Sequence, residues 1–251
     1  RDNMLYAEIR FAPLLHTENG LSAEDVVSVV DAAVQTATQN TGIEARVLLC
    51  TLRSFSETQS LETVKLVEQF RGTSVVGFDI AGDEVGFPVD AHIAAFQYAR
   101  AHNIPCTAHA GEASGAESVW ETLQHFNPLR IGHGWRSIED AALLEHLRKH
   151  QIHLEVSPTS NVHVYHQVLN TYSDHPIDTI YDSGISMSVN SDVRTLISVT
   201  LTEEYEKMNR AFGWKKEHFL QCNLNALRAA FISEPVKQQL IDHLLAAYGT
   251  L

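Results

Sequence analysis

Histidines and acidic residues recur where the predicted strands of this chain end. The segments are D-I-A-G-D-E from Asp79, H-A-G-E from His109, G-H-G from Gly132, S-P-T-S-N from Ser157 and N-S-D from Asn190. In a parallel α/β fold the carboxyl ends of the strands share one face, so we expect these side chains to converge. A single such residue is more often a capping or hydrogen-bonding group. Several together, flanked by glycines that allow tight turns, predict a functional centre.

Two of these residues have the chemistry of zinc ligands. His109 offers an imidazole nitrogen and Asp192 a carboxylate oxygen, and zinc takes both in a four-coordinate site with one position open for water. Two ligands do not hold a catalytic zinc, so we expect the others to precede Arg1.

Glu112 and His133 each have a functional and a structural interpretation. Glu112 follows His109 by three residues, which suits a general acid or base beside a metal. It could instead be a carboxylate near the N-terminus of a helix predicted to begin at Ser114. His133 lies between two glycines and could orient a reacting hydroxide or take its proton. The alternative is a hydrogen-bonded histidine of the core.

The elements that position these residues alternate regularly along the chain. Apolar runs predict strands, and amphipathic segments of 10–15 residues between them predict helices, which is typical of βαβ units around a parallel sheet. Ser22 and Asp25 have the spacing of a capping box at the first helix. We predict strands over 5–10, 46–52, 75–81, 104–109, 130–133, 152–156 and 185–191, and helices over 22–40, 60–70, 89–102, 114–125, 138–150, 176–181, 202–212, 215–231 and 234–248.

Seven strands favour a closed (β/α)8 barrel over an open doubly wound sheet. An open sheet commonly has about five or six strands, and no glycine-rich nucleotide motif follows any strand here. Seven is one short of the barrel, and the first strand begins within a few residues of Arg1. We therefore expect one (β/α)8 TIM-type barrel domain over residues 1–251, lacking its first strand in this chain.

Composition excludes several partners. The chain of 251 residues has 18 basic and 31 acidic residues and a formal net charge of −13, which disfavours nucleic acids and anionic membranes. No apolar run approaches the roughly 18 residues of a membrane span. Cys50, Cys106 and Cys222 are too few for a disulfide framework, which predicts a reducing cytoplasm. The oligomeric state is not indicated.

The five motifs, in this order and spacing, resemble the adenosine deaminase family of metal-dependent aminohydrolases. The similarity extends from Y-A-E-I-R-F-A-P at Tyr6 to L-T-E-E-Y at Leu201 and the C-terminal helices. H-A-G-E followed about twenty residues later by I-G-H-G is a specific signal for this family, and the combination of all five motifs is a strong one. The resemblance implies a (β/α)8 barrel with one zinc ion and a small purine nucleoside as substrate.

The resemblance also implies a role for each motif residue. His109 and Asp192 would be zinc ligands, Glu112 the proton shuttle to purine N1, and His133 the residue that orients the zinc-bound hydroxide. Gly82 would present its backbone to the N3 edge of the purine, and Asp79 would support the floor of the pocket. The implied reaction is hydrolysis of adenosine or deoxyadenosine to inosine or deoxyinosine with release of ammonia, which requires a Glu112 that starts protonated.

Two departures from the family pattern leave alternatives open. The family's H-x-H motif, which supplies the other two zinc ligands, is absent from this sequence. A truncated barrel without catalytic activity is therefore one alternative. Val193 stands where the family typically has a second aspartate that forms a hydrogen bond with purine N7. An aminohydrolase acting on another 6-aminopurine compound is the other alternative, and Arg194 could compensate for the lost contact.

Overall fold

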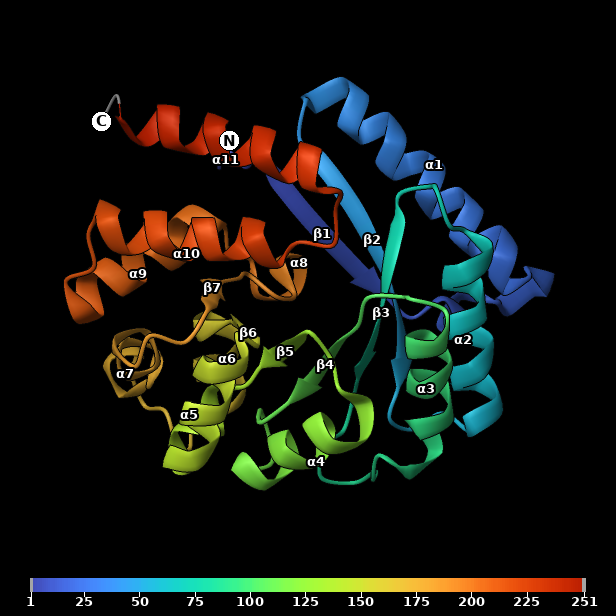
Figure 1. Ribbon diagram of the computed structural model, residues 1–251, viewed down its shortest axis with the longest axis horizontal. Coiled ribbons are helices and arrows are strands. Elements are labelled where there is room, and N and C mark those ends of the chain that lie inside the picture. The colour runs from blue at the N-terminus through green and yellow to red at the C-terminus, as the bar shows by residue number, and fades with distance from the viewer. Residues whose placement is uncertain (1, 250–251) are drawn as a thin grey trace. The chain divides into compact units, whose positions relative to one another are not determined.

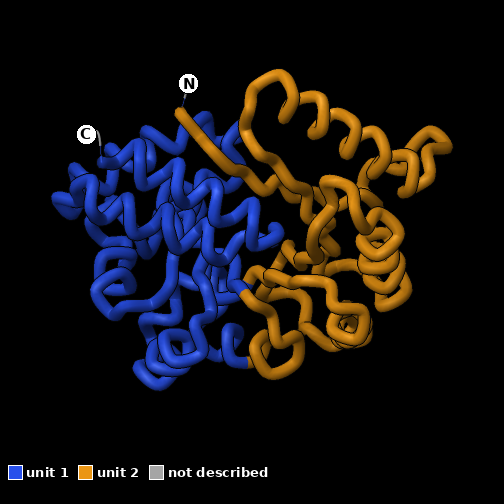
Figure 2. The backbone as a smooth tube through the Cα atoms, turned by 45° about the horizontal axis from the view of Figure 1, so that its top comes forward, with its two compact units in different colours: residues 1–2, 110–120, 130–251 blue, residues 3–109, 121–129 orange. Residues whose placement is uncertain are grey.

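A computed structural model describes residues 2–249, and it divides into two compact units. Unit 2 comprises Asn3–His109 and Glu121–Leu129. Unit 1 comprises Asp2, Ala110–Trp120 and the chain from Arg130 onward. Figure 2 shows the two units in different colours. The expectation of a single barrel domain over 1–251 stays a prediction, and each unit is described by itself.

Unit 2 contains a parallel three-stranded sheet in the order β1-β2-β3 (Figure 1). The strands are β1 Tyr6–Phe11, β2 Glu44–Leu52 and β3 Val75–Ala81. The helices α1 Ala23–Thr41, α2 Glu57–Gln69 and α3 Ile93–Ala101 belong to the same unit. Most of β2 is buried, as expected for a strand of a parallel sheet that is covered on both faces.

The core of unit 2 lies between this sheet and its helices. Phe78 of β3 packs at 4.9 Å between ring centroids on Phe96 of α3, which stacks at 3.9 Å on Phe126. All three rings are buried. Burial of such side chains is the main stabilising contribution, about 1.5–3 kcal/mol for each.

Unit 1 contains the parallel strands β5 Arg130–His133, β6 His153–Val156 and β7 Met187–Val189. Its helices include α5 Ala141–His150, α6 Pro158–Val164, α7 Ile177–Asp182, α8 Arg194–Ile197, α9 Leu201–Phe212, α10 Lys216–Ala229 and α11 Glu234–Gly249. Trp214 is fully buried in this unit, and its indole nitrogen donates to Asp178 at 2.6 Å. Two elements have residues in both units, namely β4 Thr107–Ala110 and α4 Ala116–Phe126.

The strand order confirms the α/β class with parallel strands. Within each unit consecutive strands are neighbours, without the reversal of order that marks the switch point of a doubly wound sheet. Seven strands occur among residues 2–249, each overlapping a predicted one. Closure into an eight-stranded barrel stays a prediction.

Several boundaries differ from the predicted ones for local reasons. Helix α2 begins three residues early because Ser56 and Gln59 form a capping box. Strand β4 begins at Thr107 rather than at residue 104, since Pro105 has no N–H to donate to a ladder. Helix α6 was not predicted, because its first residues are polar and no apolar period marks them.

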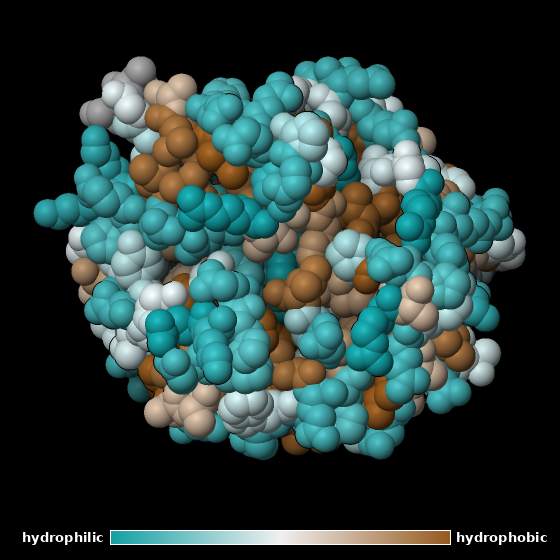
Figure 3. Space-filling view, viewed as in Figure 1, coloured by the Kyte–Doolittle hydropathy of each residue, from teal (hydrophilic) through white to brown (hydrophobic). Residues whose placement is uncertain are grey.

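The surface and the cysteines agree with the compositional analysis. The face shown in Figure 3 is mostly hydrophilic, as expected for a chain with 20% charged residues. Cys50, Cys106 and Cys222 are buried free thiols. Among residues 2–249 we find no helix with the length and apolar character of a membrane span.

Candidate active site

In unit 2, His109 is held at the end of β4 by the neighbouring strand β3. Its Nδ1 lies 2.9 Å from the carbonyl oxygen of Ile80 and 3.2 Å from Oδ1 of Asp79. Because a carbonyl oxygen only accepts, Nδ1 carries a proton, and in the neutral ring Nε2 then carries the lone pair. This is the arrangement of a metal-ligating imidazole whose second nitrogen is fixed by the surrounding protein.

Asp79 is the buried anchor of this arrangement. Its side chain has no exposed surface, and its Oδ2 accepts from Nη1 of Arg10 at 2.8 Å. Its Oδ1 also accepts from the backbone N–H of Ile80 at 2.7 Å. Asp79 therefore orients His109, which is compatible with the predicted support of the pocket floor. Arg10 was not identified from the sequence.

Gly82 lies just after β3 in a conformation that favours glycine. Its φ is +104°, and a Cβ there would lie 3.4 Å from the backbone nitrogen of Arg53. The buried Arg53 also donates to the carbonyl oxygen of His109 at 3.1 Å. Gly82 itself is exposed, so its backbone is accessible as the predicted contact to a purine edge requires.

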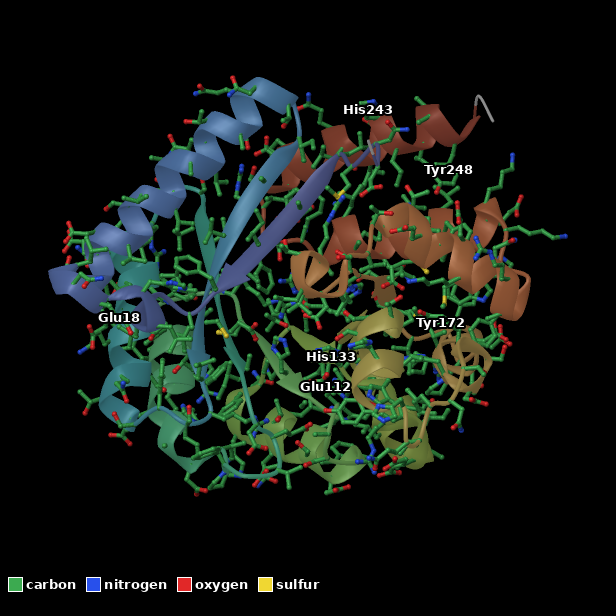
Figure 4. The ribbon with its side chains drawn as sticks, turned by 180° about the vertical axis from the view of Figure 1, so that it is seen from behind. Glu18, Glu112, His133, Tyr172, His243 and Tyr248 are labelled. Carbon is green, nitrogen blue, oxygen red and sulfur yellow. The ribbon has the colours of Figure 1, made fainter. Side chains whose placement is uncertain are left out.

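In unit 1, two close backbone approaches position Glu112 and His133. A Cβ on Gly111 would lie 3.4 Å from Cα of Gly134, and the N–H of Gly134 donates to the carbonyl oxygen of Ala110 at 3.0 Å. The resulting distance between His133 Nε2 and Glu112 Oε2 is 3.6 Å. Figure 4 shows these two side chains beside each other.

The alternative interpretation of Glu112 as a carboxylate of the following helix is not supported. Helix α4 begins at Ala116, two residues later than predicted, and the acidic residue of its first turn is Glu117. Glu112 precedes the helix by four residues and lies within reach of His133 instead. The acid–base role of Glu112 stays a prediction.

His133 has an uncommon backbone conformation. Its φ is +60°, and the next residue, Gly134, has φ +61°. Asp192 also has a positive φ, +49°. Non-glycine residues adopt this left-handed region infrequently, and such strain concentrates at functional sites. Two of the predicted site residues thus lie where the fold stabilises an unfavourable local conformation.

We expect Gly134→Ala to destabilise the chain more than Gly213→Ala. Both glycines have positive φ, but a Cβ on Gly134 would meet Cδ2 of Leu154 at 2.8 Å, whereas none of the described residues lies within 4 Å of one on Gly213. The strain common to both is about 1–2 kcal/mol, and overpacking adds about 1–3 kcal/mol at Gly134. Urea unfolding of both variants measures the difference. Equal losses would show that Leu154 moves aside.

Asp192 follows β7 and is oriented by helix α6. Its Oδ2 accepts from the hydroxyl of Ser160 at 2.6 Å. Val193 is 41% exposed, and the guanidinium of the next residue, Arg194, pairs with Asp2 at 2.9 Å. The proposed compensation by Arg194 for the missing second aspartate is not tested by this contact.

The donor chemistry of His109 and Asp192 fits zinc. Their imidazole nitrogen and carboxylate oxygen are ordinary zinc donors, and each is held by its own neighbours. His109 belongs to unit 2 and Asp192 to unit 1. Among residues 2–249, no group of three or more His, Cys, Asp or Glu is arranged to hold a metal.

Sequence reasoning missed three further residues around the site in unit 1. His175, directly before α7, and Asn161 of α6 connect to His133 through hydrogen bonds. Glu204 of α9 is fully buried, and burial raises its pKa to about 7. Asn161 lies inside the S-P-T-S-N motif, but the only sequence signal for His175 is its place before Pro176.

Comparison with known proteins identifies the family of this chain. The family model for adenosine deaminase matches residues 1–247. This chain belongs to the adenosine deaminase family. Family membership assigns it to an enzyme class, the hydrolytic deaminases, and confirms the predicted aminohydrolase type of reaction.

Individual relatives support the same assignment. The chain is 35% identical to an adenosine deaminase of Mycolicibacterium gilvum over 97% of its own length and 71% of the relative's. It is also 35% identical to adenosine deaminase 1 of Streptomyces coelicolor, over 92% of its own length and 61% of the relative's.

Solved structures confirm the α/β fold of the family. An adenine deaminase of Arthrobacter aurescens superposes with a TM-score of 0.90 at 26% identity, over 98% of this chain and 74% of that one. The N6-methyl-AMP deaminase of Arabidopsis thaliana has a TM-score of 0.89 at 25% identity, over 99% and 74%. A Burkholderia amidohydrolase with bound zinc, at 22% identity, has a TM-score of 0.89 over 99% and 71%.

Proposed function

We propose that this chain carries the catalytic residues for hydrolytic deamination of adenosine or deoxyadenosine to inosine or deoxyinosine, with release of ammonia. The observation that carries the proposal is the pairing of Glu112 with His133 at 3.6 Å, on a backbone whose positive φ and close contacts at 111 and 134 favour glycine. Adenosine deaminase relatives at 35% identity support the substrate.

Each site residue has a role in this proposal. His109, through Nε2, and Asp192 are proposed as ligands of zinc. Zinc, when bound, supplies the Lewis acidity that makes water nucleophilic at neutral pH. His133 orients the attacking water toward C6 of the purine. Gly82 contacts the base through its backbone, and Asp79 keeps His109 in the ligating tautomer.

Glu112 moves the proton in the proposed reaction. Its protonated carboxyl donates to N1 of the purine, which breaks the aromaticity of the ring and lets the nucleophile add at C6. The amino group then leaves the tetrahedral carbon as ammonia, and the oxygen of the water becomes the 6-oxo group. Of the two protons that the water gives up, one goes to the departing amino group and the other restores the carboxyl of Glu112, while N1 keeps the proton that Glu112 donated. His133, 3.6 Å away, is positioned to hold the nucleophile on the side from which Glu112 acts.

The direct test is product formation by the purified chain. Adenosine is incubated with the 251-residue protein, and inosine and ammonia are quantified together with bound zinc. We expect inosine and ammonia in equal amounts from protein that contains zinc, and at least about 100-fold less product from Glu112→Gln prepared in the same way, which excludes a contaminating deaminase. A zinc-containing protein without product would contradict the proposal and favour the catalytically inactive alternative.

Val193 supports a second candidate, an aminohydrolase for another 6-aminopurine compound. A valine side chain cannot form the hydrogen bond with N7 that a second aspartate would form, and one hydrogen bond contributes about 0.5–1.5 kcal/mol. Two structural neighbours are named for adenine and for N6-methyl-AMP. The reaction type is therefore better supported than the choice of purine.

We expect Val193→Asp to shift the preference among purines by about 2- to 10-fold in kcat/KM, because a protonated aspartate can donate a hydrogen bond to N7, which only accepts. The measurement compares adenosine with 7-deazaadenosine, which lacks N7. Leu196→Asp is the matched control, since it adds the same charge to an exposed residue of α8 three positions away. An unchanged preference in Val193→Asp would mean that this position does not contact the base.

A further inference from the structure

A chain of buried hydrogen bonds in unit 1 leads from the start of α7 to His133. The backbone N–H of Ile177 lies 3.1 Å from Nδ1 of His175, and Nε2 of His175 lies 3.2 Å from Oδ1 of Asn161. Nδ2 of Asn161 lies 3.0 Å from Nδ1 of His133. These three residues are almost fully buried: His175 is 2% exposed, Asn161 0% and His133 4%. All three contacts lie within unit 1.

The direction of every bond in this chain follows from its first donor. A backbone N–H can only donate, so Nδ1 of His175 must accept with its lone pair. Burial and the nearby His133 lower the pKa of His175 to about 3, so the ring is neutral and its proton is on Nε2. Nε2 then donates to Asn161 Oδ1, which leaves the amide NH2 of Asn161 facing His133.

This direction determines the tautomer of His133. The NH2 group of Asn161 donates to Nδ1 of His133, so Nδ1 carries the lone pair and the proton of the neutral ring is on Nε2. Nε2 is the atom that lies 3.6 Å from Glu112 Oε2 (Figure 4). The proton-bearing edge of His133 therefore faces Glu112.

We propose that His175, acting through Asn161, is a positioning residue that keeps His133 in the Nε2–H tautomer. His133 then presents a hydrogen-bond donor, and not a lone pair, on the side of Glu112. A proton on Nδ1 would require the amide of Asn161 to turn over and His175 to give up its bond from Ile177. The role of this tautomer in catalysis rests on the proposed function. The tautomer itself is a property of the chain without substrate and can be measured independently of any activity.

The test reads the tautomer directly. In a chain labelled with 15N in its histidines, two-bond 1H–15N correlations distinguish a protonated ring nitrogen from one with a lone pair. The signals of His133 are assigned by their loss in His133→Gln. We expect the Nε2–H tautomer for both His133 and His175 in the wild type. A protonated Nδ1 on His133 would overturn the proposal.

Two variants test whether His175 and Asn161 cause this state. Asn161→Asp keeps the shape of the side chain but offers only acceptors, so we expect Nδ1 of His133 to gain a proton. His175→Phe keeps a ring but no longer orients Asn161, so we expect His133 to populate both tautomers. His153→Phe is the control, because His153 is also buried in unit 1 but bonds to Ser186 and Ser188. Unchanged His133 signals in Asn161→Asp would overturn the proposal even if His175→Phe fails to fold.

Kinetics separate this inference from the proposed function. We expect kcat of Asn161→Asp to fall by about 10- to 100-fold, with little change in KM. Losses of this size are usual when a site histidine loses the side chain that orients it through a hydrogen bond. A general loss of packing would instead affect His153→Phe equally. Absence of deamination in a zinc-containing wild type with the expected tautomers would contradict the proposed function alone. Deamination with a protonated Nδ1 would contradict the present inference alone.

Discussion

Glu112→Gln is expected to lower the rate of adenosine deamination by about 100- to 10,000-fold, the usual contribution of general acid–base catalysis. Glutamine keeps the size of the side chain and its place 3.6 Å from Nε2 of His133. Its amide cannot deliver a proton to N1 of the purine. Substrate binding and folding should therefore persist while turnover is lost.

The measurement for Glu112→Gln combines turnover, zinc content and thermal stability. The zinc content should equal that of the wild type, because Glu112 is not among the proposed ligands. Glu117→Gln is the matched control, since Glu117 lies in the first turn of α4 and accepts from Gly115 rather than facing His133. Turnover by Glu112→Gln close to that of the wild type would remove Glu112 from the mechanism.

Glu204→Gln is expected to stabilise the chain at pH 8 by up to about 3 kcal/mol. Glu204 is fully buried on α9, and burial raises its pKa from the ordinary 4.5 to about 7, despite the lowering effects of Thr159 and Lys207. A tenfold change in an acid dissociation constant corresponds to about 1.4 kcal/mol of free energy between the two protonation states. Above this pH the ionised carboxylate of Glu204 therefore destabilises the folded chain. Glutamine stays neutral and removes this destabilisation.

The sign of the pH dependence follows from proton binding. Between the ordinary pKa of 4.5 and the folded pKa of about 7, the folded state holds a proton on Glu204 that the unfolded state has lost. The stability of the wild type relative to the variant is therefore greatest below pH 4.5 and falls as the pH rises through 7. The two proteins should have similar stability near pH 4 and differ most at pH 8.

Urea unfolding of both proteins at several pH values measures this difference. Glu206→Gln is the control, because Glu206 lies on the same helix but is exposed and paired with Arg210. We expect no comparable pH-dependent gain in Glu206→Gln. A difference between Glu204→Gln and the wild type that stays constant from pH 4 to pH 8 would show that folding leaves the pKa of Glu204 at its ordinary value.

The sequence by itself determined the elements whose signals are local. The capping box at Ser22 and Asp25 begins α1 as predicted, and each of the seven observed strands overlaps a predicted apolar run. Such signals depend on residues a few positions apart, and buried parallel strands read as nearly continuous apolar runs. The five motifs likewise lie within short segments, so the family followed from the sequence alone.

Only the tertiary structure decided which partner each of these residues has. The contacts of Asp79 with Arg10 and of Asn161 with His175 and His133 join residues 14 to 69 positions apart. No local period encodes such contacts, and a lone histidine before a proline carries no visible function. The raised pKa of Glu204 has the same origin, since desolvation depends on what surrounds a side chain and not on its neighbours in sequence.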